Sequence, residues 1–275
     1  MIRRILLALG GEFYADTVIR YGVELARRHG AELTGLTVLD LDYWKGGWGS
    51  VVTPSELLRL MEDRPWQAAL QRPARIAALF TKVCKSADIK HRTIHPDSEP
   101  LNRLVAEART HDLLIFGMRG LYDRTIVPDA EATIARLIRQ NICPIVAAVP
   151  EYREIHRVMI AYNGSTQSAD AMKRFVQMNL WPEASVQIVT IHRNAAAADE
   201  LLNAARDYCR AHGMQVALLR GQGSARKQLL PMAKRHGVDL IVLADSYRSL
   251  LLHSTLGGVT RDIVRQADRP LFLTH

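Results

Sequence analysis

The feature that most constrains this chain is an internal repeat. The segment 4–11 aligns with the segment 157–164, and further along the segment 112–117 aligns with the segment 239–244. A repeat of this length is one folding unit used twice, so it fixes the number of domains before any strand or helix is assigned. We therefore expect two copies of one domain, residues 1–150 and residues 151–275.

Each copy alternates short apolar runs with stretches of helical period, which indicates a parallel sheet with helices on both faces. The runs are apolar throughout, as in strands that are covered on both sides. The predicted strands are 3–9, 33–39, 89–94, 112–117, 144–149, 156–162, 185–191, 214–219, 239–244 and 270–274. The predicted helices of the first copy are 14–29, 73–86, 99–110 and 131–141. The fold class is α/β, with two tandem five-stranded parallel-sheet domains of flavodoxin-like size.

The first copy carries an insertion of about 26 residues, near 41–66, after its second strand. Its glycine-rich stretch 45–50 predicts a loop. The segment from Thr53 to Glu56 is a capping box with proline at the first helical position, and it predicts a short helix. With its tyrosine and tryptophans, the insertion is either a flap over a binding site or an ordinary packed loop.

Composition excludes several classes of protein. The chain has 275 residues, of which 48% are hydrophobic and 23% charged, and no unbroken run of 18 apolar residues. We therefore expect a soluble, cytoplasmic protein without a membrane partner. The formal charge of +8 is scattered among acidic residues, which does not favour a nucleic-acid partner. Three widely spaced cysteines predict neither a disulfide framework nor a zinc site.

Ligands of open parallel sheets bind at the carboxyl ends of the strands, where the strand order reverses. This rule selects the loops that follow the first and fourth strands of each copy, at 10–12 and 117–120 and at 163–165 and 244–247. It also draws attention to the stretch 256–261, just before the last helix. Glycines there free backbone amides to approach an anion, and the helix that follows adds a partial positive charge.

These residues, in this order, resemble the universal stress protein family, and the resemblance covers nearly the whole chain as a tandem pair. The family fold is adenine nucleotide alpha hydrolase-like. Its fingerprint is a glycine, two residues, a glycine, nine residues, and then glycine with serine or threonine. In members that bind nucleotide, this loop holds ribose and phosphates, an acid after the first strand contacts ribose, and main chain at the end of the second strand meets adenine.

In the first copy, Gly117 and Gly120 match the first two glycines of the fingerprint, and Val38 stands at the end of the second strand. The closing glycine and serine are replaced by Ala130 and Glu131, which puts a carboxylate where phosphate oxygens would lie. Like charges repel, so the first copy departs from the nucleotide-binding pattern.

The second copy departs from the pattern in a complementary way. Ala244 and Tyr247 replace the first two glycines, and tyrosine disfavours a positive φ. Gly257 and Gly258 supply the closing turn, with Gly258 in place of the usual serine, and Asn163 stands where the family has its acid. The site residues that the resemblance implies here are Asn163, Gly164, Ile191, Ala244, Gly257, Gly258 and Val259.

The resemblance implies a stress-response protein that binds ATP or a related nucleotide, with or without Mg²⁺, in its second domain. The alternative is a degenerate member that no longer binds nucleotide and acts as an interaction or regulatory scaffold. Ser165, Asp170 and His192 supply the residue types of a hydrolase triad, but no nucleophile elbow surrounds the serine. We expect no enzyme activity beyond weak ATP hydrolysis. The resemblance also implies that the last strands pair across a pseudo-twofold axis, as an intramolecular pseudo-dimer or in a homodimer.

Overall fold

A computed structural model gives the architecture, and it describes residues 2–10, 12–37, 64–96, 100–118, 135–138, 140, 143–245 and 257–274. The strands are β1 Arg4–Leu9, β2 Glu32–Thr37, β3 His91–Ile94, β4 Leu113–Gly117, β5 Ile145–Ala148, β6 Arg157–Ala161, β7 Ser185–Ile191, β8 Val216–Gly221, β9 Leu240–Ala244 and β10 Leu271–Thr274. The helices are α1 Glu12–His29, α4 Arg64–Ser86, α5 Pro100–Ala108, α7 Thr166–Met178, α8 Ala195–Ala211, α9 Ala225–Arg235 and α10 Gly258–Gln266. All ten predicted strands are present, with small differences at their ends.

The strands form one sheet in the order β3-β2-β1-β4-β5-β10-β9-β6-β7-β8. Pairing is parallel within each half of the sheet. In each half the strand order reverses between the first and fourth strands, at β1 and β4 and again at β6 and β9. These two reversals are where an open α/β sheet forms a binding crevice. The predicted fold class is confirmed.

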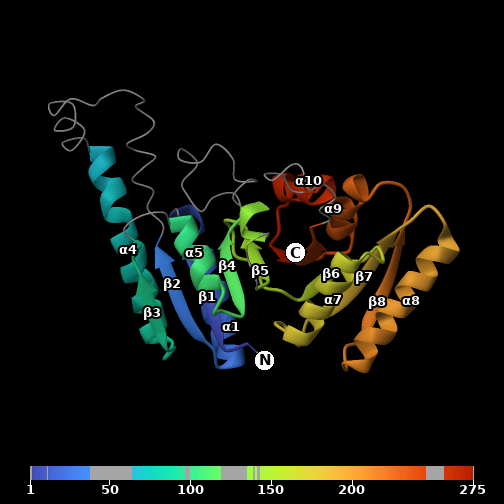
Figure 1. Ribbon diagram of the computed structural model, residues 1–275, viewed down its shortest axis with the longest axis horizontal. Coiled ribbons are helices and arrows are strands. Elements are labelled where there is room, and N and C mark those ends of the chain that lie inside the picture. The colour runs from blue at the N-terminus through green and yellow to red at the C-terminus, as the bar shows by residue number, and fades with distance from the viewer. Residues whose placement is uncertain are drawn as a thin grey trace.

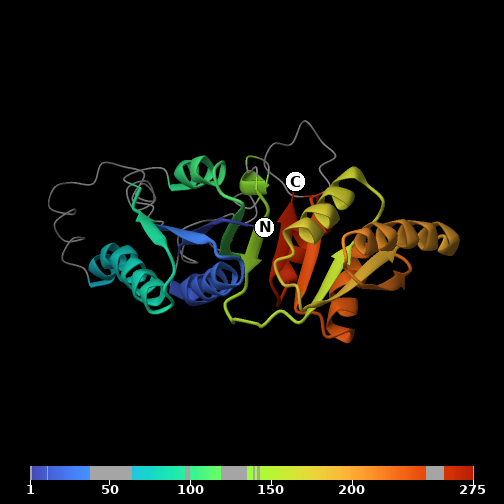
Figure 2. The same cartoon turned by 90° about the horizontal axis from the view of Figure 1, so that it is seen from below.

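The two halves meet at the centre of the sheet, where β5 and β10 pair antiparallel and Val146 lies opposite Phe272. This is the expected pairing of the last strands across a pseudo-twofold axis. Figure 1 shows the halves side by side, with both chain termini near the middle. Figure 2, turned by 90°, shows helices on either side of the strands.

Alternating side chains of the strands point into two hydrophobic cores. One core contains buried residues of α1, α4, α7 and α8, and it includes Phe80, Phe175 and Phe272. The other core contains buried residues of α5, the helical stretch 135–138, α9 and α10. Because both faces are covered, the strands can be apolar at nearly every position, as the sequence shows.

An aspartate fixes the start of the first strand in each half. Asp112 Oδ2 accepts hydrogen bonds from the backbone amides of Arg3 and Arg4, at 2.7 and 2.9 Å. In the second half, Asp239 Oδ2 accepts from the amides of His156 and Arg157 at 3.0 and 2.9 Å. The repeat therefore preserves a specific polar contact as well as an apolar pattern.

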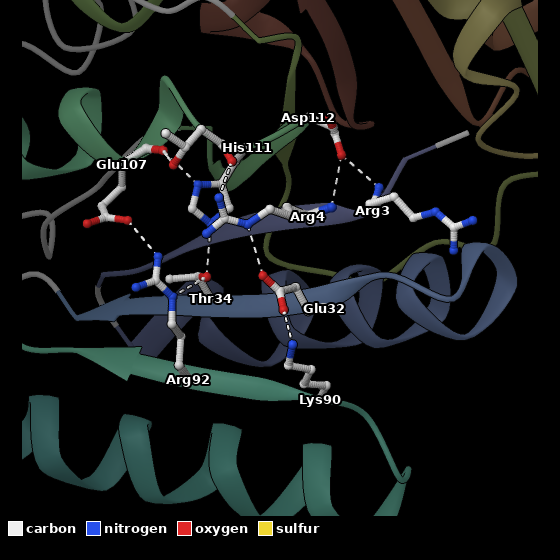
Figure 3. Close-up of polar contacts among 10 residues, drawn as sticks. Arg3, Arg4, Glu32, Thr34, Lys90, Arg92, Glu107, His111 and Asp112 are labelled. Atoms are coloured by element: carbon white, nitrogen blue, oxygen red, sulfur yellow. Dashed lines mark hydrogen bonds and ion pairs between the residues drawn. The ribbon is translucent and has the colours of Figure 1, made fainter.

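A buried histidine joins three elements at the amino end of the first half-sheet. His111 is 7% exposed, and its Nδ1 donates to the carbonyl of Glu107 at 2.6 Å. Because a carbonyl only accepts, Nε2 is the acceptor, and it takes a hydrogen bond from Thr34 Oγ1 at 2.9 Å. Figure 3 shows Arg92 on the same threonine hydroxyl and Arg4 nearby, beside Glu32. Burial lowers the pKa of His111, which favours the neutral ring in which Nε2 accepts.

Helix α1 connects the two halves through Glu24. One carboxylate oxygen of Glu24 accepts from Trp181 Nε1 at 3.0 Å and from Arg28 at 2.9 Å. The other accepts from the Tyr152 hydroxyl at 2.9 Å. Trp181 belongs to the second half and is 3% exposed. The Tyr152 ring also stacks near Tyr21, whose hydroxyl donates to the carbonyl of Arg153 at 2.7 Å. Polar contacts therefore reinforce the central strand pairing.

One helix differs from its prediction. The sequence predicts a start at Pro73, but α4 begins at Arg64 and Pro73 lies inside it. A proline inside a helix removes one backbone hydrogen bond, yet residues 64–72 continue the same helix on its amino side. The predicted helix at 53–56 and the glycine-rich stretch at 45–50 lie outside the described residues. Cys84, Cys143 and Cys209 form no disulfide. Across the described part of the chain, every helix is too short or too polar to span a bilayer.

Candidate functional site

A small cavity opens at the carboxyl ends of β6, β7 and β9, at the reversal of strand order in the second half. Helices α9 and α10 close it with their first residues. Its volume is about 100 Å³, below the roughly 300 to 1,000 Å³ typical of ligand pockets. The residues that line it are Ala161, Tyr162, Asn163, Ser165, Ser168, Val189, Ile191, Ala225, Leu229, Leu243, Ala244, Val259 and Thr260. The described residues therefore enclose less space than a drug-sized ligand fills.

The walls of the cavity are mostly aliphatic, and the hydroxyl groups of its two serines and its threonine are engaged by the protein. Ser165 Oγ caps α7 by accepting the amide of Ser168 at 3.2 Å, and Ser168 Oγ donates to the carbonyl of Ser165 at 2.9 Å. Thr260 Oγ1 donates to the carbonyl of Ala244 at 3.2 Å. The pocket therefore offers an apolar surface with few free polar groups.

Asn163 forms the rim of the cavity. Its Oδ1 accepts the amide of Ser165 at 3.0 Å, which closes a tight turn before α7. Gly164, at the centre of this turn, has a φ of +78°. The turn leaves the side-chain amide of Asn163 as a donor at the rim, where the family resemblance implies a ribose contact.

A buried carboxylate follows Ala244, a lining residue of the cavity, in the chain. Asp245 follows the last residue of β9 and is 3% exposed. Its Oδ1 accepts the backbone amide of Gly257 at 2.8 Å, at the N-terminus of α10. Its Oδ2 is buried and has no hydrogen-bond partner in the described structure. The negative charge of Asp245 therefore sits where a helix N-terminus would attract an anion.

Two arginines lie near the same helix start: Arg226 is paired, whereas the buried Nε of Arg261 has no hydrogen-bond partner in the described structure. Arg226, in the first turn of α9, forms an ion pair through its Nε with Asp262 of α10. One of its terminal nitrogens donates to the carbonyl of Gly258 at 3.2 Å. These contacts join α9 to α10, and they engage the Arg226 guanidinium with groups of the protein itself.

The structure brings together four of the predicted site residues, Asn163, Ile191, Ala244 and Val259, around the cavity. Gly164 lies in the adjoining turn, and Gly257 and Gly258 form the start of α10. Among the residues that sequence reasoning missed, Asp245 is the most informative. The family fingerprint specifies glycines and leaves the residue after the first of them open. A charged residue directly after an apolar strand was the available signal.

The position equivalent to Ala244 in the first half is Gly117, and its surroundings differ. A Cβ atom built on Gly117 would lie 2.7 Å from Tyr14 Cβ, closer than real contacts allow. Tyr14, from the first turn of α1, thus packs directly on Gly117 and is itself 9% exposed. A side chain at position 117 would therefore clash with Tyr14, which is a packing reason for glycine here. The other two predicted residues of this half, Val38 and Gly120, lie outside the described residues.

The contacts in this region bear on two kinds of site, a hydrolase triad and a metal site. The residues of the suggested triad do not converge, because Asp170 pairs with Arg174 at 2.7 Å and His192 Nδ1 contacts the carbonyl of Asn194 at 3.0 Å. Within the described ranges, no group of three or more His, Cys, Asp or Glu residues could hold a metal ion.

Comparisons with known proteins agree with the architecture. The universal stress protein family matches residues 1–146 and 154–275, so the chain belongs to this family. A universal stress protein of Synechocystis is 22% identical over 290 residues, which cover 98% of this chain and 99% of the relative. A solved universal stress protein from Archaeoglobus fulgidus has a TM-score of 0.69 at 14% identity and covers 98% of this chain and 97% of its own. A universal stress protein solved in complex with cAMP is 22% identical and covers 45% of this chain and 98% of its own, with a TM-score of 0.39.

Proposed function

We propose that this tandem universal stress protein binds the base of an adenine nucleoside or nucleotide in its C-terminal half, with the domain boundary near Pro150. The observation that carries the proposal is the apolar cavity between Ile191 and Val259, at the reversal of strand order. This is the place where open α/β sheets take their ligands. The family includes a member solved in complex with cAMP, so adenine compounds are the natural probes.

Cavity filling tests the proposal. Ala225 is the first residue of α9 and lines the cavity, so Ala225→Leu places three more carbon atoms in a volume of about 100 Å³. Calorimetric titration with adenosine, AMP and ATP should show an affinity at least tenfold lower than in the wild type, about 1.4 kcal/mol. Ala195→Leu is the matched control, because Ala195 is the first residue of α8 and is exposed.

The two variants separate binding from general damage. The control should bind like the wild type, since its added side chain points to solvent. If the wild type binds none of the three ligands, or if Ala225→Leu binds them unchanged, the cavity is not the site.

A scaffold role is the second candidate, and it concerns the N-terminal half. Phe13, at the start of α1, is 67% exposed, which is unusual for a phenylalanine, and its neighbour Tyr14 fills the space beside Gly117. An exposed aromatic ring at the start of α1 is suited to a contact with another protein. If Phe13 serves a scaffold role, Phe13→Ser should leave ligand binding by the C-terminal half unchanged. The same variant should reduce the amount of any protein complex that crosslinking in cells recovers with the wild type.

A further inference from the structure

A second hollow lies at the amino ends of β7 and β8, which end the sheet on the side of the second half. Its volume is about 720 Å³, within the range of roughly 300 to 1,000 Å³ that is typical of ligand pockets. Helices α7 and α8 both end beside it, because their C-cap residues, Asn179 and His212, belong to its lining. It shares no lining residue with the cavity at the carboxyl ends of the strands, so the two are separate places on the molecule.

The first half has an equivalent hollow at the amino ends of β2 and β3, and ion pairs of the protein cross it. Lys90 Nζ lies 2.9 Å from one carboxylate oxygen of Glu32, and Arg4 Nε lies 2.9 Å from the other. Two residues further along, Arg92 donates to the hydroxyl of Thr34 at 3.1 Å. Figure 3 shows these side chains reaching from one strand to the next. The first half therefore occupies this end of its sheet with its own charged side chains.

The second half has an uncharged residue at each of these strand positions. The registers of the two halves match Glu32 with Ser185, Lys90 with Gln215, Thr34 with Gln187, and Arg92 with Ala217. The ion pairs of the first half cannot form here, and an alanine stands in place of an arginine. The hollow of the second half accordingly extends along the strands to Gln187 and Ala217, whereas the lining of the first-half hollow includes neither Thr34 nor Arg92.

The protein leaves the side-chain oxygen of Gln187 without a donor. Gln187 lines the hollow, and its Oε1 is buried with no hydrogen-bond partner among the described residues. A buried acceptor without a donor is destabilising. In the first half Arg92 supplies a donor to the equivalent Thr34, but Ala217 has none to supply. The last bond of a glutamine side chain rotates over a broad range, so this amide can turn to meet a ligand in the hollow.

The lining favours an uncharged ligand. Within the described part of the chain it contains no lysine, arginine or aspartate, and its one carboxylate, that of Glu183, is 83% exposed and lies 3.6 Å from Arg28. The other polar side chains of the lining are Gln177, Asn179, Ser185, Gln187, His212 and Gln215. The two helix C-termini present backbone carbonyls and negative dipole ends, which disfavours a phosphate. Amide and hydroxyl groups both donate and accept, so they match a ligand that carries several hydroxyl groups.

We propose that this hollow is a binding site for a small sugar or polyol. The ligand hydroxyls take the place of the charged side chains of the first half, with one hydroxyl donating to Gln187 and others bonding to Ser185 and Gln215. The carbon skeleton of the ligand packs on the apolar part of the lining, which includes Met214 and Val216. The inference goes beyond adenine binding and does not depend on it, because the two places lie at opposite ends of the strands.

Titrations of the full-length protein followed by NMR test the proposal with four probes. Glucose and maltose are the uncharged ligands, and glucosamine and glucose 6-phosphate are cationic and anionic forms of the same ring. The wild type should bind glucose or maltose at least fivefold more tightly than either charged probe. Adenosine is titrated alongside, and its failure to bind the wild type contradicts the proposed function alone.

Two variants locate the site. Ala217→Arg restores the arginine that the first half has at this position, which fills the hollow and occupies Gln187, so binding of the uncharged probe should weaken at least tenfold. Gln187→Met keeps the length of the side chain but removes its amide, and it should weaken binding at least threefold. Ala196→Arg is the matched control for Ala217→Arg, because Ala196 is also an exposed alanine of this half but lies in the first turn of α8, after the carboxyl end of β7.

The outcomes decide between this site and its alternatives. If neither uncharged probe binds the wild type, or if a charged probe binds as tightly, the inference is wrong. It is also wrong if Ala217→Arg and Ala196→Arg have equal effects, since the probe then binds elsewhere on the protein. If Ala217→Arg does not fold, the selectivity of the wild type and the loss in Gln187→Met decide the matter.

Discussion

Gly164 lies directly against Leu201: a Cβ atom on Gly164 would be 2.6 Å from Leu201 Cδ2. The same glycine has a φ of +78°, where side chains other than glycine are strained. Two independent constraints, conformational and steric, therefore act at the turn that carries Asn163. This turn connects β6 to α7 at the rim of the cavity.

We expect Gly164→Ala to lower the free energy of unfolding by about 2–4 kcal/mol, combining roughly 1–2 kcal/mol of left-handed strain with an overpacking cost of similar size. Gly213→Ala is the matched control, because Gly213 has a φ of +77° and open space around its Cβ position. Urea denaturation of both variants measures the difference. Equal losses would mean that Leu201 moves aside at no cost.

The sequence predicted the sheet because the repeat and the apolar runs both depend on local pattern. Four residues of the cavity could also be predicted, since the carboxyl-end rule needs only the strand ends. The role of Asp245 could not, because it depends on Gly257 returning from twelve positions along the chain to meet its carboxylate. The packing of Tyr14 on Gly117 was missed for the same reason: the contact joins α1 to β4, and neither residue reveals it alone.

His111 should make stability depend on pH. Burial lowers the pKa of His111 below its ordinary value of 6.5, and the nearby Arg4 acts in the same direction, while the hydrogen bond to the Glu107 carbonyl opposes them. The folded protein thus binds fewer protons at this site than the unfolded chain. Its contribution to stability is present above pH 6.5 and is lost as the pH falls through that value toward the folded-state pKa.

His111→Gln removes the titrating group and keeps hydrogen-bonding atoms for Thr34 and Glu107. Urea denaturation between pH 7.5 and pH 5 should show a smaller loss of stability for the variant than for the wild type over this interval. His156→Gln is a suitable control, since His156 is a solvent-exposed histidine beside Glu154. A wild-type profile parallel to that of His111→Gln would show that the buried histidine does not contribute to the pH dependence.

Glu24 should hold the halves together beyond the pairing of β5 with β10. Glu24→Ala removes the acceptor of the Trp181 indole N–H and of the Tyr152 hydroxyl, and an unpaired buried donor costs about 1–3 kcal/mol. We therefore expect a loss of this size in the free energy of unfolding, with a change in tryptophan emission in the folded state. Denaturation followed by fluorescence measures both.

The control for this cluster is Glu183→Ala. The Glu183 side chain is 83% exposed and contacts Arg28 at 3.6 Å, so its removal should cost less than about 0.5 kcal/mol. If Glu24→Ala is as mild as Glu183→Ala, the carboxylate of Glu24 does not stabilise the junction, and strand pairing with apolar packing suffices.

Gly117 distinguishes a glycine kept for packing from a glycine kept for a phosphate. If Tyr14 is the reason for the glycine, Gly117→Ala should destabilise the protein by about 1–3 kcal/mol through overpacking, and it should leave ligand binding in the C-terminal half unchanged. Ala244, at the equivalent position of the second half, carries a Cβ atom, so the fold itself tolerates alanine there. In a double-mutant cycle, Gly117→Ala should cost less in a Tyr14→Ala background, because the opposing ring is gone. If the losses in the free energy of unfolding are additive, Gly117 and Tyr14 are not coupled. Gly117 would then again be a candidate ligand-binding residue.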